Sequence, residues 1–199
     1  TGANISIRLT DEFMEAVVAN EDYEVRFPVD SAEPLISERI SAKEIWDEIV
    51  ESAWQYAEPG LLFWDSVTKF SPADIYADFG FKTISTNPCG EIPLCAYDSC
   101  RLMVVNLLSF VQNPFTEQSA FDFNAFSLVV QQAQRLMDDL IDLELEQVEK
   151  IIAKIEADPE PEEIKQGELS LWRKVREKAV NGRRTGLGVT AIGDMLAAL

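Results

Sequence analysis

The chain opens with a strand pattern that runs directly into a helix pattern, and this junction constrains the local fold more than any other feature. Apolar and polar residues alternate over residues 4–9, which predicts a strand with one covered face. The apolar positions are Ile5, Ile7 and Leu9, and the polar positions are Asn4, Ser6 and Arg8. Thr10 then has the character of a helix N-cap, with Asp11 and Glu12 at the positive end of the helix dipole. The apolar stripe of this helix is predicted at Phe13, Met14, Val17 and Val18.

Further strand signals follow along the chain. A second short strand is predicted over residues 23–29. Two apolar runs, residues 61–64 and 104–111, are candidates for buried strands, although periodicity alone leaves the first of them ambiguous.

Two helices are delimited by their flanking residues. Ser41 and Glu44 have the spacing of a capping box, and the helix that they begin stops at Glu58-Pro59-Gly60. A longer helical pattern begins near Phe123 and ends at Asp158-Pro159-Glu160-Pro161, because proline cannot continue a helix. The tryptophans fall on helical or buried patterns and are interpreted as core residues: Trp46, Trp54, Trp64 and Trp172.

Net charge and segment lengths exclude several classes of partner. The 199-residue chain carries a formal net charge of -18, which repels phosphate backbones and anionic lipid surfaces. We therefore expect no nucleic-acid partner and no membrane partner. No apolar run is long enough for a membrane span and the first residues lack signal-peptide features, so the sequence predicts a cytoplasmic location.

Both ends of the sequence fall inside structural elements. The chain begins almost directly in a strand and closes in an apolar helical run, residues 192–199, without a stop signal. We expect residues 1–199 to be a fragment of a single catalytic domain that is truncated at both ends.

Three cysteines, Cys89, Cys95 and Cys100, lie close together in the sequence. An odd, clustered set without a signal peptide is typical of chemical use rather than of a disulfide scaffold. No Cys-x-x-Cys spacing occurs and the chain has no histidine, so we predict no metal site. Cys95 is interpreted as a small buried apolar residue.

A loop is predicted to present Cys89. Pro88 and Gly90 bracket this cysteine, so neither a helix nor a regular strand suits the segment. In an extended backbone alternate residues point the same way, which would direct Asn87, Cys89 and Glu91 into one pocket. A carboxylate neighbour favours the neutral thiol, whereas a nucleophilic thiolate needs a basic or cationic partner. The trio therefore favours chemistry with a neutral thiol, and on spacing alone a purely structural turn stays open.

The segment around Cys89 closely resembles the finger-loop region of ribonucleotide reductases. The resemblance is carried by Asn87-Pro88-Cys89-Gly90-Glu91-Ile92-Pro93-Leu94, Tyr97-Asp98-Ser99-Cys100 and Asn106-Leu107. Three further segments resemble the same family in the same order: residues 5–17, 59–65 and 182–196. The version with proline and glycine around the cysteine is most similar to the adenosylcobalamin-dependent class II enzymes.

The resemblance implies an α/β fold that is part of a ten-stranded α/β barrel, with a central finger loop carrying the radical cysteine. It implies that Cys89 is the thiyl-radical residue that abstracts the ribose 3′ hydrogen. Glu91 would be the general base on the 3′ hydroxyl, and Asn87 would position the ribose hydroxyls. Cys100 would be one of the two thiols that reduce the 2′ position.

The resemblance also implies partners. The substrate would be a ribonucleotide and the cofactor adenosylcobalamin, although it assigns no residue of this chain to cofactor binding. A thioredoxin-type reductant would act through C-terminal cysteines that this sequence lacks, and the second reducing cysteine, expected upstream of Cys89, is also absent. We expect the intact enzyme to be a homo-oligomer and this piece alone to be inactive.

Two other interpretations of the sequence stay open. A class I reductase large subunit would take its radical from a separate subunit, and a non-catalytic fragment would be completed by another chain. Gly186-Leu187-Gly188 lacks the third glycine of a phosphate-binding loop, which argues against nucleotide binding there. Arg183 and Arg184 are interpreted as surface charges.

Overall fold

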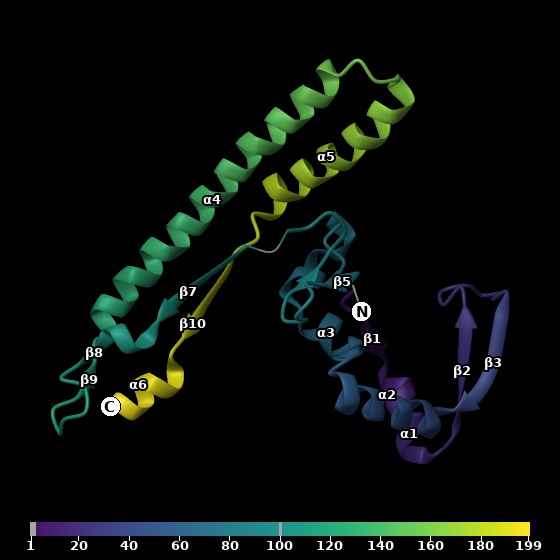
Figure 1. Cartoon of the computed structure of the whole chain (residues 1–199), viewed down its shortest axis with the longest axis horizontal. Coiled ribbons are helices and arrows are strands. Elements are labelled where there is room, and N and C mark those ends of the chain that lie inside the picture. Colours follow the sequence, from purple (N-terminus) through teal and green to yellow (C-terminus); the bar gives the residue numbers. More distant parts are fainter. Residues whose placement is uncertain (1–2, 100) are drawn as a thin grey trace. The chain divides into compact units, whose positions relative to one another are not determined.

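The structure, a computed structural model, describes residues 3–99 and 101–199 (Figure 1). The chain divides into two compact units, Thr1–Ala96 and Tyr97–Leu199. The strands of the described residues form five sheets of two strands each. The predicted mixture of helices and strands is therefore confirmed, whereas the described residues do not close the expected ten-stranded barrel. The assignment of residues 1–199 to a single domain stays a prediction.

The first unit is built around a parallel strand pair and an antiparallel hairpin. Its elements, in order, are β1 (Ser6–Leu9), α1 (Asp11–Ala19), β2 (Asp22–Phe27), β3 (Ile36–Ser41), α2 (Ala42–Tyr56), β4 (Gly60–Phe63), α3 (Trp64–Phe70), the 3-10 helix η1 (Pro72–Phe79), β5 (Ser85–Thr86) and β6 (Pro93–Leu94). Strand β1 pairs in parallel with β4, so that Ser6 lies opposite Gly60. Strands β2 and β3 pair antiparallel with Asp22 opposite Ser41.

The predicted helix starts of this unit are confirmed. The Thr10 hydroxyl accepts a hydrogen bond from the Phe13 N–H at 3.2 Å, and the Ser41 hydroxyl accepts one from the Glu44 N–H at 3.3 Å. These bonds satisfy backbone donors that the first turn of a helix leaves free. Helix α2 ends at Tyr56, and the next residue, its C-cap Ala57, has a left-handed backbone.

A small apolar core joins β1, α1 and α2. Its buried residues are Leu9, Phe13, Ala42 and Ile49. Val18, which was predicted in the apolar stripe of its helix, and Trp54, which was predicted as a core residue, are instead 86% and 82% exposed, so these two predictions are wrong for the described structure. Each directly follows a residue of the core-facing stripe, and one step along a helix turns the side chain by about 100° away from that face.

The second unit combines a parallel strand pair with a long helical hairpin. Its elements are β7 (Leu102–Asn106), the 3-10 helix η2 (Leu107–Phe110), β8 (Val111–Gln112), β9 (Ala120–Phe121), α4 (Phe123–Ala157), α5 (Glu162–Gly182), β10 (Gly186–Thr190) and α6 (Ile192–Ala198). Strands β7 and β10 pair in parallel with Leu102 opposite Gly186. The buried strand predicted over residues 104–111 is only partly correct, because β7 ends at Asn106 and Val104 is exposed.

Helices α4 and α5 lie side by side as an antiparallel hairpin (Figure 1). The side chain of Asp122 caps α4 by accepting from the Ala125 N–H at 2.9 Å. The helix ends at Ala157, before Asp158-Pro159, as predicted. Met137 and Ile141 on α4 are fully buried, and a separate cluster joins the far parts of both helices through Val148, Ile152, Ile155 and Leu169. Among the described residues, none of the helices combines the length and the apolar character needed to cross a membrane.

Candidate functional site

Cys89 lies at the tip of a short hairpin in the first unit. Strand β5 pairs antiparallel with β6, with Ser85 opposite Leu94. The ladder extends on both sides, because the Ile84 N–H donates to the Leu94 carbonyl at 2.9 Å and the Asn87 N–H donates to the Ile92 carbonyl at 3.2 Å. The hairpin thus fixes the two ends of the segment that carries Cys89.

The segment itself is a tight turn and not the extended strand that the alternate-residue argument assumed. The Gly90 N–H donates to the Asn87 carbonyl at 3.0 Å, so Pro88 and Cys89 are the two central residues of the turn. Proline presets the backbone angle of the first central position, and Gly90 has a φ of +86°, which glycine adopts without strain. The extended-backbone prediction for Asn87, Cys89 and Glu91 is therefore wrong.

The turn places the three predicted residues differently. Asn87 is buried, with 9% of its surface exposed, and its side-chain oxygen accepts from the Ile92 N–H at 2.9 Å. Cys89 is a free, exposed thiol, and Glu91 is exposed as well. The described residues therefore do not gather the three side chains into one enclosed pocket. Instead, the Cys89 thiol lies at the tip of a turn, and the Asn87 side chain stabilises this turn by accepting the hydrogen bond from the Ile92 N–H.

A buried polar contact holds the base of this hairpin. The backbone N–H and the hydroxyl of Thr83 donate to the two carboxylate oxygens of Asp74, at 3.0 and 2.5 Å. Thr83 is buried, and its hydroxyl lies 3.5 Å from that of buried Ser71. Because a buried polar group that loses its partner is costly, this contact restrains the chain just before β5.

Two hollows flank the Cys89 turn. One has a volume of about 210 Å³ and includes Cys89, Gly90 and Glu58 in its lining, and the other has a volume of about 430 Å³ and includes Asn87 and Arg8. Both are also lined by a shared set of residues: Asn4, Ser6, Leu62 and Pro88. The polar residues that precede and form β1 therefore face the turn.

The sequence argument missed these polar residues as part of the candidate site. It identified the alternation of Asn4, Ser6 and Arg8 with apolar positions, but only as the uncovered face of a strand. That alternation was the available signal, because a polar strand face that borders a reactive loop is suited to binding a polar ligand. The Arg8 guanidinium lies 4.8 Å from the centre of the Trp64 ring, a cation–π contact that orients it.

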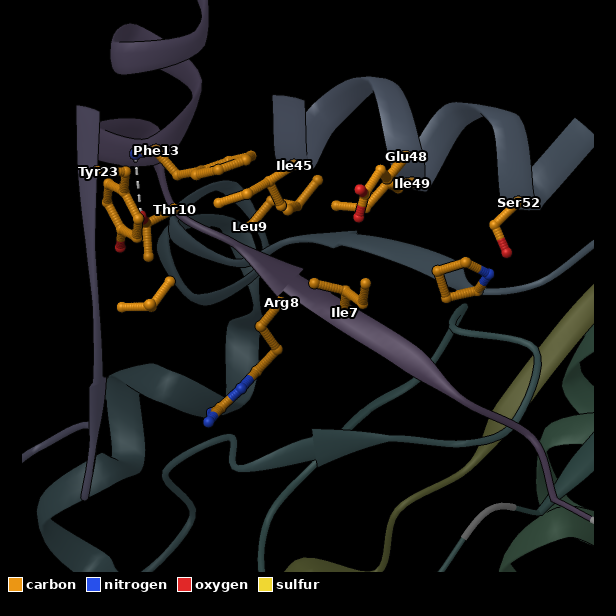
Figure 2. Close-up of a pocket in the computed structure, with 12 residues that line it drawn as sticks. Ile7, Arg8, Leu9, Thr10, Phe13, Tyr23, Ile45, Glu48, Ile49 and Ser52 are labelled. Atoms are coloured by element: carbon orange, nitrogen blue, oxygen red, sulfur yellow. Dashed lines mark hydrogen bonds between the residues drawn. The ribbon is translucent and has the colours of Figure 1, made fainter. Parts of the chain in front are cut away.

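A third hollow, of about 400 Å³, lies on the opposite face of β1, against α1, β2 and α2. Figure 2 shows Ile45, Glu48 and Ile49 from α2 on one side of the strand and the Arg8 side chain extending from the other side. Its lining is mainly apolar and includes none of the residues predicted to carry chemistry. We therefore place the candidate site at the Cys89 turn.

Of the other two cysteines, Cys95 lies within the described residues. Cys95 is buried, which confirms its interpretation as a small buried residue. Cys100 lies outside the described residues. In residues 3–99 and 101–199, no group of three or more histidine, cysteine, aspartate or glutamate side chains could hold a metal ion.

The two arginines that were predicted to be surface charges, Arg183 and Arg184, form ion pairs within the second unit. Arg183 donates to Asp138 at 2.7 Å and to Asp142 at 2.8 Å, and Arg184 lies 3.1 Å from Asp98. The hydrogen bond that Arg183 donates to Asp138 is the main cause that holds the pKa of Asp138 below its ordinary value, and the same bond is the main cause that raises the pKa of Arg183.

Comparison with known proteins identifies the family. A family model described as "Ribonucleotide reductase, barrel domain" matches residues 1–199. The chain belongs to this family.

Ribonucleotide reductases from several organisms are similar to the chain over much of its length. A protein of Thermoplasma acidophilum named vitamin B12-dependent ribonucleoside-diphosphate reductase is 35% identical over 199 residues, covering 98% of this chain and 21% of that protein. A protein of the same name from Mycobacterium tuberculosis is 30% identical over 196 residues, covering 98% of this chain and 23% of that protein. A vitamin B12-dependent ribonucleotide reductase of Rhodopirellula baltica is 32% identical over 126 residues, covering 62% of this chain and 11% of that protein. The chain thus spans about a fifth of the length of the first two reductases.

Proposed function

We propose that the full-length protein reduces ribonucleotides to 2′-deoxyribonucleotides by a thiyl-radical mechanism and so supplies precursors for DNA. Membership of the reductase family and the names of the relatives support this function. The structural observation that supports this function is the free Cys89 thiol, which is exposed at the tip of a hydrogen-bonded turn between two hollows. We also propose that both units belong to one barrel domain, in which the Cys89 hairpin is the central finger loop.

The proposed roles follow from the chemistry of each side chain. As a thiyl radical, Cys89 takes a hydrogen atom from the ribose 3′ carbon and becomes a neutral thiol. The radical itself forms when a neutral thiol loses a hydrogen atom, so the cysteine needs no cationic partner. Glu91 accepts the proton of the 3′ hydroxyl. Cys100 and a second cysteine supply two electrons and two protons as the 2′ hydroxyl leaves as water, and the two sulfurs become a disulfide. Cys89 then returns a hydrogen atom to the 3′ carbon, which completes the product and regenerates the thiyl radical.

Asn87 has a double role in this proposal. Its side-chain oxygen is engaged by the Ile92 N–H, which leaves the amide NH₂ group as the donor available to a ribose hydroxyl. The hollow beside Asn87, with Arg8, Thr86 and Ser6 in its wall, offers polar groups to a nucleotide.

The proposed cofactor is adenosylcobalamin, which would supply the radical when bound. The hollow at Cys89, of about 210 Å³, is smaller than a typical pocket for a drug-sized ligand and does not fit a corrin ring. This hollow therefore does not supply a cobalamin site by itself. The cobalamin class is favoured over the class I alternative because the relatives are named vitamin B12-dependent.

The partners of the full-length enzyme are also proposals. A thioredoxin-type protein would reduce the disulfide, and the enzyme would act as a homo-oligomer in the cytoplasm. The -18 net charge supports the absence of a nucleic-acid or membrane partner.

Single-turnover assays of the full-length protein test the function. Cys89→Ser should form no deoxyribonucleotide, because a hydroxyl does not replace a thiol as a hydrogen-atom carrier. The matched control is Cys95→Ala, which changes a buried cysteine outside the turn and should keep most of the activity. Product formation by Cys89→Ser above the trace level would refute the radical role, and omission of adenosylcobalamin should stop turnover if the enzyme is of class II.

Three further substitutions separate the roles of Glu91 and Asn87 at the turn. Glu91→Gln should slow the chemical step and leave nucleotide binding intact. Asn87→Asp keeps the oxygen that accepts from Ile92 but removes the NH₂ donor, whereas Asn87→Ala removes both. We expect both Asn87 variants to bind nucleotide more weakly and only the alanine variant to loosen the turn.

Size-exclusion chromatography of residues 1–199 tests the non-catalytic alternative, because a piece completed by another chain should not run as a folded monomer alone.

A further inference from the structure

We propose that Asp74 and Thr83 are positioning residues for Cys89, because their hydrogen bonds set the direction of the Cys89 hairpin (residues 84–94). This inference rests on the proposed function, in which the Cys89 sulfur must meet one carbon atom of the ribose. All of the residues concerned lie in the first unit. Their contacts connect the hairpin to the β1–β4 strand pair, whose residues line both hollows beside Cys89.

The contacts begin at the junction between α3 and η1 (residues 71–74). Ser71 follows the last residue of α3, and its N–H donates to the Val67 carbonyl at 2.9 Å. The Ser71 carbonyl accepts from the Asp74 N–H at 3.2 Å. Helix α3 directly follows β4, and its Asp65 accepts from the Asp11 N–H just after β1 at 2.7 Å. The junction is therefore attached to both strands of the parallel pair.

The Asp74 carboxylate holds Thr83 at two points. One oxygen accepts from the Thr83 N–H at 3.0 Å and the other accepts from its hydroxyl at 2.5 Å. Because a carboxylate oxygen only accepts, the hydroxyl is the donor, and its own oxygen can accept from the Ser71 hydroxyl at 3.5 Å. Thr83 is 2% exposed and Ser71 is 8% exposed, so little water competes for these bonds. A two-point contact of this kind fixes orientation as well as position.

The hairpin is held at its base and at its tip. Thr83 directly precedes it, and the next N–H, that of Ile84, already bonds across the ladder. At the tip, a terminal methyl carbon of Leu62 on β4 lies only 3.3 Å from the position of a Cβ built on Gly90. An apolar contact is not directional, because it depends on area and not on angle. The bonds between Asp74 and Thr83 therefore decide the angle at which the hairpin leaves the unit.

The proposed chemistry requires such a restraint. A misplacement of about 1 Å can lower the rate of an enzyme about 100-fold. Pro88, Cys89 and Glu91 are exposed in the described structure, so apolar burial orders the tip only weakly. A satisfied, buried polar network is rigid. The network of Asp74 and Thr83 can therefore supply the order that packing at the tip does not.

The experiment uses the full-length protein, three variants and a matched control. Thr83→Val removes the hydroxyl and keeps the shape of the side chain, whereas Thr83→Ser keeps the hydroxyl and removes a methyl group. Asp74→Asn replaces the oxygen that accepts from this hydroxyl with an NH₂ group. The matched control is Thr68→Val, the same change in helix α3, where the hydroxyl donates to the Trp64 carbonyl at 3.1 Å. Single-turnover rate, nucleotide Kd, thermal unfolding and amide exchange at Ile84 are measured for each.

We expect Thr83→Val to lower the single-turnover rate about 10–100-fold. The nucleotide Kd should change much less, because binding is spread over the whole nucleotide whereas hydrogen-atom transfer depends on one distance. Exchange at Ile84 should become about tenfold faster, since a buried acceptor loses its partner beside it. Thr83→Ser should restore most of the rate, Asp74→Asn should lower it in the same way as Thr83→Val, and Thr68→Val should behave as the wild type.

A folded Thr83→Val variant with the wild-type rate would overturn the proposal. An equal loss of rate in Thr83→Ser or in Thr68→Val would also overturn it, because the hydroxyl at the hairpin base would then not be the cause. If Thr83→Val does not fold, Asp74→Asn decides by the same criterion. An active Cys89→Ser variant, together with faster Ile84 exchange in Thr83→Val, would refute the proposed function and still confirm that this contact anchors the hairpin.

Discussion

The glycine after Cys89 is the position where the turn is most sensitive to a single methyl group. Gly90 has a φ of +86°, and a left-handed backbone costs other residues about 1–2 kcal/mol. A Cβ built at this position would lie 3.3 Å from a terminal methyl carbon of Leu62, so that side chain would have to shift slightly. We therefore expect Gly90→Ala to destabilise the turn by about 1–2 kcal/mol.

Amide hydrogen exchange reports this local change. The Ile92 N–H is protected by its bond to the Asn87 side chain, which opens when the turn opens. A loss of 1–2 kcal/mol should speed its exchange by about 5–30-fold. The matched control is Gly167→Ala in helix α5, where a new Cβ has no neighbour within 4 Å. That change should stabilise its helix by about 0.5–1 kcal/mol and slow exchange there.

Gly90→Ala is expected to speed local amide exchange and Gly167→Ala to slow it, so the two measurements together decide the outcome. Unchanged or slower exchange at Ile92 in Gly90→Ala would show that residue 90 does not need the left-handed conformation. Faster exchange in the α5 segment of Gly167→Ala would show that the method does not isolate backbone strain.

Three further changes test the packing and charge pairs described above. Thr10→Ala removes the acceptor for the Phe13 N–H and should lower the free energy of unfolding by about 1 kcal/mol, as measured by urea denaturation. Met137→Ala empties a fully buried site on α4 and should cost about 2–5 kcal/mol, which thermal denaturation would detect. The pKa of Asp138 is lowered mainly by its hydrogen bond from Arg183, so the stabilisation by this pair should be complete above the ordinary value of 3.8 and lost as the pH falls below it. The difference in urea midpoint between wild type and Asp138→Asn should therefore shrink on acidification, and a difference that grows toward low pH would contradict this assignment.

The parts of the fold that depend on neighbouring residues were predicted well from the sequence. The caps at Thr10 and Ser41 and the end of α4 before Pro159 involve groups within a few positions of one another. Their physics is local, because a side chain either can or cannot satisfy the backbone groups of the adjacent turn.

The candidate site was predicted in part. Pro88 and Gly90 correctly indicated a loop around Cys89, but the relative directions of Asn87, Cys89 and Glu91 were wrong because the chain reverses there instead of running extended. The contribution of β1 was missed because a strand pattern shows that one face is polar and does not show what that face meets. The role of Cys100 and the closure of the barrel stay predictions, since neither lies within the described residues.

The sequence by itself determined the identity of the reactive segment, the starts of α1 and α2, the end of α4 and the resemblance to ribonucleotide reductases, because each depends on residues that lie close together in the sequence. Only the tertiary structure decided that Asn87 closes the turn, that Asn4 and Ser6 face it, and that Arg101 is buried against Glu144. The last contact joins residues 43 positions apart, and no local pattern distinguishes a buried arginine from a solvated one. Burial and charge pairing depend on which distant segments meet, and that is a property of the folded chain.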